Sequence, residues 1–236
     1  MEDPDVETSS EGYARRFAGP VGAFFLAVQA RATLELLAPW PRSRVLDVGG
    51  GHGQVTGPLL EAGHEVTVYG SAGALGEGIR KWTESGRVPF REGDLLHAPW
   101  PDRAFDVVVS YRLLAHVARW SELLAELCRL ARTAVLVDYP TARSANAAAA
   151  ALFGLKKGVE GNTRPFTVFR DAEVEGALAA SGFRKTGRQA EFFFPMAVHR
   201  ALRSAPLARA LEGAAAGLGL TRALGSPVIL RGERRG

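Results

Sequence analysis

The sequence predicts an α/β fold in which a mostly parallel sheet lies between two layers of helices. Short runs rich in β-branched residues alternate five times with stretches of helical periodicity, the pattern of a doubly wound sheet. The run 106–110 holds three consecutive valines, as expected of a parallel strand buried on both faces. Four glycines follow the first strand within 49–53 and indicate a ligand site at the carboxyl end of the sheet.

In the first half of the chain, the elements follow from periodicity and from the residues that end each run. Apolar side chains recur at helical spacing around Gly19-Pro20, and Pro39 and Pro41 end that helix. Gly63 is a typical C-cap for the helix after the glycine turn. The expected elements, in order, are a helix over 12–37, a strand over 44–48, a helix over 54–62, a strand over 65–69, a helix over 73–84 and strands over 88–92 and 106–110.

The second half continues the alternation. Leu123, Leu127 and Leu130 recur at helical spacing, and Gly182 ends a later helix. A long run that begins at Phe183 and a last apolar run near the C-terminus fit strands. The expected elements are a helix over 119–131, a strand over 133–138, helices over 143–154 and 171–181, a strand over 183–194, a helix over 196–218 and a strand over 227–232.

Length and composition favour a single globular domain. The 236 residues carry a formal net charge of +4 without a block of like charges, so no nucleic-acid partner is expected. Residues 1–11 hold five acids and no base, and we expect a mobile, solvated acidic arm there. Cys128 is the single cysteine, which excludes an intrachain disulfide. With no signal peptide and no expected membrane span, we expect a cytoplasmic protein.

The acid before the glycine turn narrows the class of ligand. Asp47 stands two residues before Gly49, and a carboxylate there favours a ligand with a positive or hydroxyl-rich end. A dinucleotide fingerprint needs Gly-x-Gly-x-x-Gly, but the last position is Gln54 counted from Gly49 and Thr56 counted from Gly51. The turn therefore indicates S-adenosylmethionine more than a nicotinamide cofactor, and an NAD-dependent oxidoreductase is disfavoured.

An ordered set of motifs follows this turn: Asp47–Gly53, Gly93-Asp94, Phe105–Ser110, Leu114–Val117, Ala134–Asp138 and Ala180–Phe183. In order and spacing the set resembles the class I S-adenosylmethionine-dependent methyltransferases, especially the branch that acts on small molecules. The resemblance implies a Rossmann-like, three-layer fold with seven strands and an antiparallel C-terminal hairpin. It also implies methyl transfer to an O, N or C nucleophile of a small molecule, with S-adenosylhomocysteine as the product.

The resemblance also divides the chain into parts of a single methyltransferase domain over 1–236. It implies an N-terminal helical cap over 1–40, a cofactor-binding core over 41–190, and a helical insertion over 196–224 before the last strand. A monomer or homodimer is expected.

The resemblance implies how the cofactor is held. Asp47 meets the amino group, the glycine turn meets the methionine moiety, and Asp94 and Leu95 meet the adenine, while Tyr13 and Arg16 fold over the cofactor. Purely structural roles remain open: a loop cap for Asp47, a turn for Asp94, and helix packing for Tyr13 and Arg16. The expected cofactor residues are Tyr13, Arg16, Asp47, Gly49, Gly50, Gly51, Gly53, Gly70, Ser71, Asp94, Leu95, Ser110 and Tyr111.

The end of the second strand departs from the family pattern. An acidic residue usually grips the ribose hydroxyls there, as in other nucleotide sites. Gly70 occupies this position and has no side chain. Ser71 is the expected replacement contact, and Glu77 is a more distant one.

His116 is the candidate catalytic residue, because an unperturbed imidazole titrates near neutrality and suits a general base. A structural role at the cofactor edge is the alternative. Asp138, Tyr139 and His199 are further base candidates. Arg112 lies just beyond the carboxyl end of its strand, where ligands bind in open α/β sheets. No metal site is expected, because the acids and histidines do not show ligand spacing.

The variable second half describes the acceptor only coarsely. Aromatic and apolar residues such as Phe166 and Met196 accompany cations such as Lys156 and Arg200, which favours a mostly apolar molecule with an anionic or polar end. A quinone precursor fits this description, and so does an ordinary apolar core. The alternative function is a catalytically inactive methyltransferase-like binding or regulatory subunit. The missing acid at position 70 favours that alternative, whereas Asp47 and Asp94 oppose it.

Overall fold

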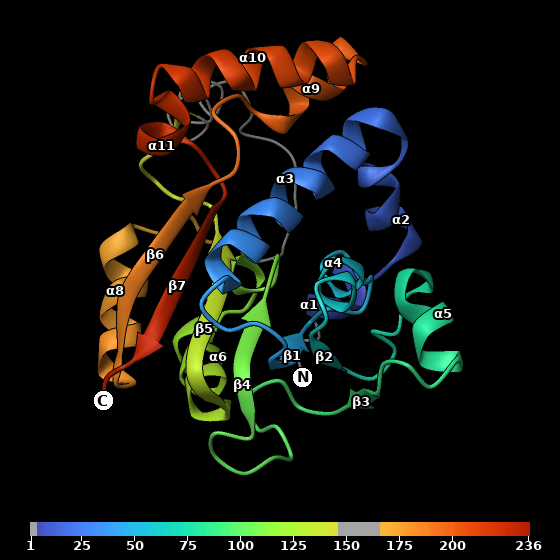
Figure 1. Cartoon of the computed structure of the whole chain (residues 1–236), viewed down its shortest axis with the longest axis vertical. Helices are drawn as coiled ribbons and strands as arrows, with labels where there is room; N and C mark the ends of the chain where they lie inside the picture. The colour runs from blue at the N-terminus through green and yellow to red at the C-terminus, as the bar shows by residue number, and fades with distance from the viewer. Residues whose placement is uncertain (1–3, 146–165) are drawn as a thin grey trace.

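The computed structural model describes residues 4–145 and 166–236, which form a seven-stranded sheet between two layers of helices (Figure 1). The strands are β1 (Arg44–Val48), β2 (Glu65–Gly70), β3 (Phe90–Glu92), β4 (Phe105–Ser110), β5 (Ala131–Tyr139), β6 (Phe183–Ala190) and β7 (Val228–Arg234). The helices are α1 (Pro4–Thr8), α2 (Glu11–Ala14), α3 (Gly19–Leu37), α4 (Thr56–Glu61), α5 (Glu77–Glu84), α6 (Trp120–Leu130), α8 (Asp171–Ala180), α9 (Met196–Leu202), α10 (Ala205–Gly217) and α11 (Leu220–Leu224), with short 3₁₀ helices η1 (Arg15–Phe17) and η2 (Leu114–His116). Most of the helix expected over 143–154, and Lys156, lie outside the described residues.

The strand order is β3-β2-β1-β4-β5-β7-β6. The neighbouring pairs from β3 to β5 are parallel, whereas β7 is antiparallel to both β5 and β6. The seven strands and the antiparallel C-terminal hairpin are therefore confirmed. The order reverses between β1 and β4, and the carboxyl ends at such a switch point form the usual ligand crevice of an open α/β sheet.

The two faces of the sheet bury separate sets of side chains. Val108 contributes to one cluster, with α6 and α8, while Val107 contributes to the other, with α3, α4 and α5. This alternation explains the valine run of β4, because both faces of the strand are fully buried. Burying each such side chain contributes roughly 1.5–3 kcal/mol.

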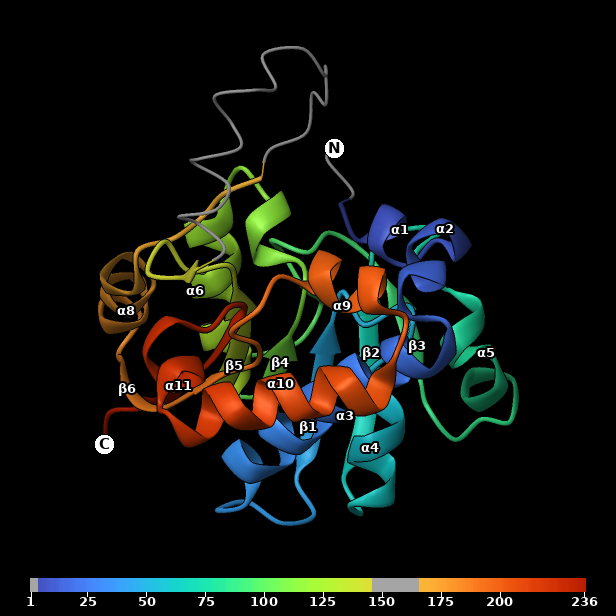
Figure 2. The same cartoon turned by 90° about the horizontal axis from the view of Figure 1, so that it is seen from above.

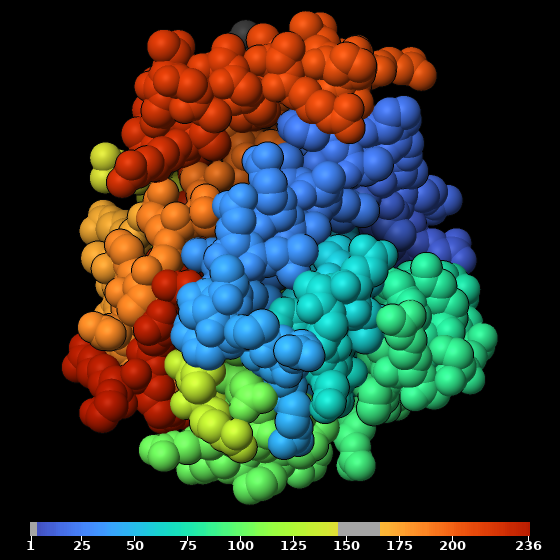
Figure 3. All heavy atoms as spheres, viewed as in Figure 1, coloured from blue at the N-terminus to red at the C-terminus, as the bar shows by residue number. Residues whose placement is uncertain are grey.

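Helices α9, α10 and α11 follow β6 and precede β7 in the chain, and α10 rests on α3 at one end of the molecule (Figures 2 and 3). The helix expected over 196–218 is broken at Arg203, whose φ is +51°, before Ser204 caps α10. Glu212 of α10 accepts hydrogen bonds from the N–H groups of Phe193 and Phe194, at 2.9 and 3.0 Å. These bonds fix the insertion against the end of β6.

The N-terminal segment is helical and packed from residue 4. Asp5 in α1 is fully buried, so the expectation of a mobile, solvated arm is wrong for residues 4–11. The helix expected over 12–37 is divided into α2, η1 and α3, with a break at Ala18, which is extended, and Gly19, whose φ is +73°. By length and composition, α3 also passes the test for a membrane span. That is weak evidence, since half of this apolar stretch is buried inside the structure, and core helices can be equally long and apolar.

Candidate functional site

The glycine turn lies between β1 and α4 and is held by close contacts that leave no room for side chains. Gly53 has a φ of +67°, and a Cβ there would lie 2.3 Å from Cγ2 of Ile79. A Cβ at Gly50 would lie 2.2 Å from the carboxylate of Asp47. The turn therefore requires glycine for its geometry, and it holds Asp47 directly beneath its backbone.

Asp47 is a buried carboxylate that suits a cationic partner. Its side chain is 1% exposed and accepts a hydrogen bond from Oγ1 of Thr56 at 3.2 Å. Burial raises the pKa of Asp47 from 3.8 to about 7, against the opposing effect of Thr56. A ligand ammonium nearby would favour the ionised form, since an opposite charge lowers the pKa of a carboxyl group.

His52 within the turn is neutral and carries free hydrogen-bonding capacity. Burial, and then the charge of Arg112, lower the pKa of His52 to about 3. Both ring nitrogens are buried, and neither has a hydrogen-bond partner among the described residues. The ring of Tyr13 stacks on His52 with centroids 5.7 Å apart, and Arg16 lies over Tyr13 at 4.9 Å. Arg16 is exposed, so Tyr13 contacts the turn and Arg16 covers Tyr13 from outside.

The ends of β2 and β3 meet beside this turn. The N–H of Gly93 donates to the carbonyl of Gly70 at 3.0 Å, which brings Asp94 next to the end of β2. Asp94 accepts from the N–H of Leu96 at 2.9 Å and pairs with Nδ1 of His97 at 2.9 Å. The bond from His97, followed by that from Leu96, lowers the pKa of Asp94. An ionised acceptor therefore stands where the resemblance expects the adenine.

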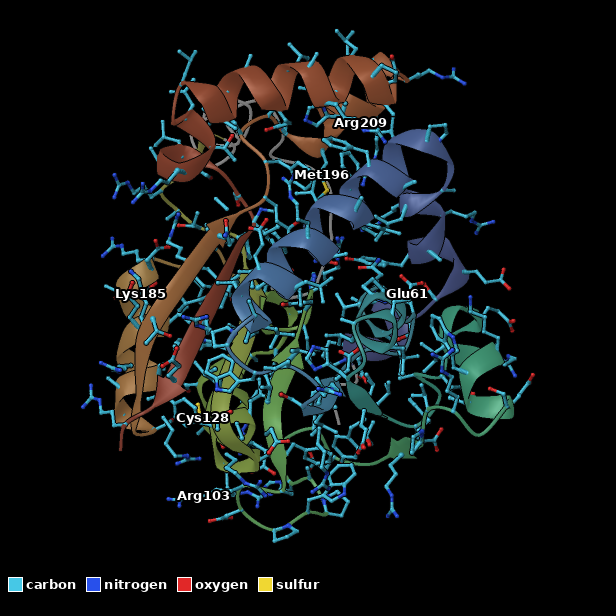
Figure 4. The ribbon with its side chains drawn as sticks, in the orientation of Figure 1. Glu61, Arg103, Cys128, Lys185, Met196 and Arg209 are labelled. Atoms are coloured by element: carbon cyan, nitrogen blue, oxygen red, sulfur yellow. The ribbon has the colours of Figure 1, made fainter. Side chains whose placement is uncertain are left out.

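A cavity of about 430 Å³ opens beside Tyr13, within the size range of small-molecule sites. Its lining is mostly apolar, and Arg112 and Asp138 contribute charged groups from the carboxyl ends of β4 and β5. The lining residues are Tyr13, Arg112, Ala115, His116, Asp138, Tyr139, Pro140, Thr141, Ser144, Phe166, Val168, Pro195, Met196, Ser226 and Pro227, with Met196 labelled in Figure 4.

Arg112 and Asp138 form the charged part of this wall. The N–H of Arg112 donates to Oδ1 of Asp138 at 2.5 Å, while Nε and Nη2 of Arg112 are buried without a partner in the described structure. The guanidinium carbon lies 4.0 Å from the ring centre of Phe17. Burial raises the pKa of Asp138 to about 6, although the charge of Arg112 opposes this shift. Arg112 can thus bind an anion, and Asp138 can exchange a proton near neutral pH.

The other base candidates differ in where they lie. His116 lines the cavity, with its ring 5.5 Å from that of Phe166. The hydroxyl of Tyr139 lies 3.2 Å from Oδ1 of Asp171 on α8, and burial first and then Asp171 raise the pKa of Tyr139 well above its usual range. His199 is fully buried beside Glu212, with 2.8 Å between Nε2 and Oε1, and does not line the cavity. The cavity therefore brings together Asp138, His116 and Tyr139 and leaves out His199. The raised pKa of Tyr139 favours Asp138 and His116 as the base candidates.

Two expected cofactor residues lie in the core. Ser110 donates its hydroxyl to the carbonyl of Val48 at 2.9 Å, which joins β4 to β1. The hydroxyl of Tyr111 lies 3.0 Å from that of Thr33 on α3. Neither side chain lines the cavity, so any contact of Ser110 or Tyr111 with a ligand stays a prediction.

Buried polar atoms without partners gather around the glycine turn. Within the described residues they include Oδ1 of Asp5, Oγ of Ser9, both ring nitrogens of His52 and Oε1 of Gln54. Such atoms are rare in folded proteins, and a ligand that binds here would give them hydrogen-bond partners. Together with the backbone cradle, they fit a cofactor that offers amino, carboxylate and hydroxyl groups. Among the described residues, no group of three histidines, cysteines or acids is placed to hold a metal ion.

Comparison with known proteins agrees with this geometry. Residues 46–136 match the family model of the methyltransferase domain. Over nearly the whole chain, the fold superposes on magnesium protoporphyrin IX methyltransferase from Synechocystis PCC 6803 with bound SAH, with a TM-score of 0.67 and 18% identity, covering 97% of this chain and 96% of that one. These matches support a class I S-adenosylmethionine-dependent methyltransferase, with the family model covering the middle part of the chain.

Two curated proteins match part of the sequence and share one name. A demethylmenaquinone methyltransferase of Deinococcus radiodurans is 34% identical over 125 residues, which are 46% of this chain and 48% of that protein. A protein of the same name from Beutenbergia cavernae is 31% identical over 136 residues, covering 56% and 55%. The chain thus spans about half the length of the curated relatives it matches.

Sequence reasoning missed Glu191, a buried acid whose charge interacts with Arg112 and Asp138 of the cavity wall. Glu191 is 4% exposed, and burial raises its pKa to about 8, with Arg112 lowering and Asp138 raising it. Its Oε1 accepts from Nε2 of Gln29 on α3 at 3.3 Å. An acid directly before three phenylalanines was the available signal, because such a position is rarely solvated.

Proposed function

We propose that this chain transfers the methyl group of S-adenosylmethionine to a small, mostly apolar acceptor that carries one acidic or anionic group. One observation carries the proposal: an apolar cavity with Arg112 and Asp138 in its wall adjoins the glycine turn through Tyr13. The residues of the turn supply the cofactor contacts that the family pattern implies. In this proposal, α9 to α11 and the helices before β1 close one domain around the site.

Each residue has a physical task in this reaction. The cofactor supplies an electrophilic methyl group on a sulfonium, and the protein aligns the acceptor and excludes water. Asp47 holds the amino group, and Asp94 holds the adenine amine. Tyr13, Phe166 and Met196 pack against the apolar body of the acceptor.

Proton transfer falls to the polar wall of the cavity. Arg112 binds the oxyanion of the acceptor, because its buried nitrogens otherwise lack an acceptor among the described residues. Asp138 takes the acceptor's proton, since a pKa of about 6 leaves it ionised at neutral pH and still able to bind a proton. His116 is the second candidate for this task and shares the same cavity.

The relatives narrow the acceptors to be tested. Proteins named demethylmenaquinone methyltransferases support an aromatic, hydroxylated acceptor, which matches an apolar cavity with one cationic contact. A second class to test is carboxylic acids of similar size, because an arginine binds a carboxylate as readily as a phenolate.

The test is transfer of a labelled methyl group from S-adenosylmethionine to a panel that contains demethylmenaquinol, simple phenols and aromatic carboxylates. Arg112→Met should raise the KM of the acceptor about tenfold or more through loss of a charge-assisted hydrogen bond, while S-adenosylhomocysteine affinity changes little. Arg209→Met is the matched control, since Arg209 is exposed on α10 and does not line the cavity (Figure 4). Cofactor binding without turnover on any member of the panel would favour a binding or regulatory subunit instead.

A further inference from the structure

A carboxylate from α1 lies where the sequence lacks an acid on β2. Oδ2 of Asp5 accepts a hydrogen bond from the N–H of Ser71 at 2.7 Å. A Cβ built on Gly70 would lie 3.0 Å from the same oxygen. The carboxylate of Asp5 therefore stands within the space that a side chain at position 70 would use.

The surroundings of this carboxylate point to a ligand. Asp5 is 0% exposed, and its second oxygen, Oδ1, has no hydrogen-bond partner in the described parts of the chain. A buried carboxylate oxygen without a hydrogen-bond donor destabilises the folded state, because the oxygen has lost its water partners. A hydroxyl donor from a ligand would remove that destabilisation.

We propose that Asp5 binds the ribose hydroxyls of the cofactor, in place of the acid that β2 lacks. The inference rests on the proposed function, because it assumes that an S-adenosyl ligand occupies the glycine turn. The Ser71 N–H orients one oxygen of Asp5 and leaves the other to accept from the ribose. Ser71 thus contributes through its backbone, and Glu77 pairs with Arg80 at 3.0 Å on the exposed start of α5.

The position along the sheet agrees with this role. The residue after α1 touches the glycine turn, since a Cβ at Gly51 would lie 2.2 Å from Oγ of Ser9. On the other side, the Gly93–Gly70 hydrogen bond places Asp94 beside β2. Asp5 therefore lies between the segment expected to bind the methionine moiety and the residue expected to bind the adenine, which is where the ribose of such a cofactor belongs.

The glycine at position 70 then has a steric explanation. A larger residue would meet Oδ2 of Asp5 at 3.0 Å and Cβ of Ala74 at 3.1 Å, both tighter than ordinary contacts. Asp5 and Gly70 are therefore sterically complementary, because the carboxylate of Asp5 occupies space that a side chain at position 70 would fill.

The experiment is calorimetric titration of the 236-residue chain with S-adenosylhomocysteine. Asp5→Asn should weaken binding about tenfold or more, because a neutral amide replaces the charged acceptor of the hydroxyls. The side-chain oxygen of the asparagine can still accept the hydrogen bond from the N–H of Ser71, so α1 keeps this contact. Glu11→Gln is the matched control, since Glu11 is an exposed acid of the same N-terminal segment, and its affinity should equal that of the wild type.

A second pair of variants separates ligand binding from folding. Asp5→Ala should bind S-adenosylhomocysteine more weakly still, and Gly70→Asp added to Asp5→Ala should recover affinity to near the wild-type value. In the double variant the Asp5 contact at Gly70 is absent, and only the Ala74 contact must adjust. A purely structural role for Asp5 would give no such recovery in a protein that melts like the wild type.

The outcomes are distinct. If the wild type does not bind S-adenosylhomocysteine, the proposed function fails and this inference fails with it. If the wild type binds and Asp5→Asn binds equally well, only the role of Asp5 is overturned. Tighter binding by Asp5→Asn would also overturn it, because α1 would then compete with the cofactor for the site.

Discussion

The wild type should become less stable as the pH rises, and Glu191 should cause much of this effect. We therefore expect Glu191→Gln to be less sensitive to pH. Glu191 is buried, and of its two oxygens only Oε1 has a partner, Nε2 of Gln29, among the described residues. Oε1 of Gln29 is likewise unpartnered. A protonated Glu191 would supply the missing donor to this pair, in agreement with the rise of its pKa to about 8 through burial.

The sign and size follow from linkage. The folded pKa lies above the ordinary value of 4.5, so the protonated form is favoured in the folded state and the native protein binds more protons between these values. This stabilisation is fully present below about pH 4.5 and is lost as the pH rises through about 8. Between about pH 5 and about pH 8 the loss is on the order of 3 kcal/mol, or roughly 6–12 °C in Tm for a chain of this size.

The assay is thermal unfolding by far-ultraviolet circular dichroism over this pH range. From about pH 5 to about pH 8, Glu191→Gln should lose about 3 kcal/mol less of its free energy of unfolding than the wild type, since glutamine carries no titrating proton. Glu61→Gln is the control, because Glu61 is an exposed acid on α4 (Figure 4) and should leave the wild-type profile unchanged. Identical profiles for wild type and Glu191→Gln would refute a protonated, buried Glu191.

Two other variants test the site. Asp138→Asn should lower kcat/KM for methyl transfer about 10²–10⁴-fold and abolish the fall in rate that the wild type shows below its pKa of about 6; an unchanged pH–rate profile would assign the base to another group. Gly53→Ala should lower stability by roughly 1–3 kcal/mol and weaken S-adenosylhomocysteine binding, because the Cβ would meet Ile79. Gly213→Ala in α10 has open space around it and should be neutral or stabilising, so calorimetric melting of both variants separates steric conflict from the general effect of alanine.

The sheet could be predicted from sequence because its signals are local. The glycines at 49–53 and the valines of β4 each specify a turn or a strand within a few residues. The predicted ends of helices were less accurate where the backbone conformation depends on tertiary packing. Arg203, for example, interrupts an otherwise helical stretch with a left-handed conformation that nothing in its residue type indicates.

The polar contacts of the site could be predicted only in part. Ser110 and Tyr111 lie at the expected strand end, but their side chains are used in the core, and the next residue, Arg112, enters the cavity with a φ of +58°. Asp5 belongs to an acid-rich segment whose composition predicts solvation. Its burial depends on a contact with Ser71, 66 residues away, which sequence patterns do not encode.

Arg112 links the two halves of the site electrostatically. Its charge lowers the pKa of His52 in the glycine turn and opposes the effect of burial at Asp138 and Glu191. In the proposed reaction an anionic acceptor would pair with Arg112 and weaken this opposition. The pKa of Asp138 would then rise, since burial is the larger of the two effects, and Asp138 would hold a proton more firmly. Anion binding at Arg112 and proton uptake at Asp138 therefore favour each other. The hydrogen bond from the N–H of Arg112 to Oδ1 of Asp138, at 2.5 Å, keeps the two residues together.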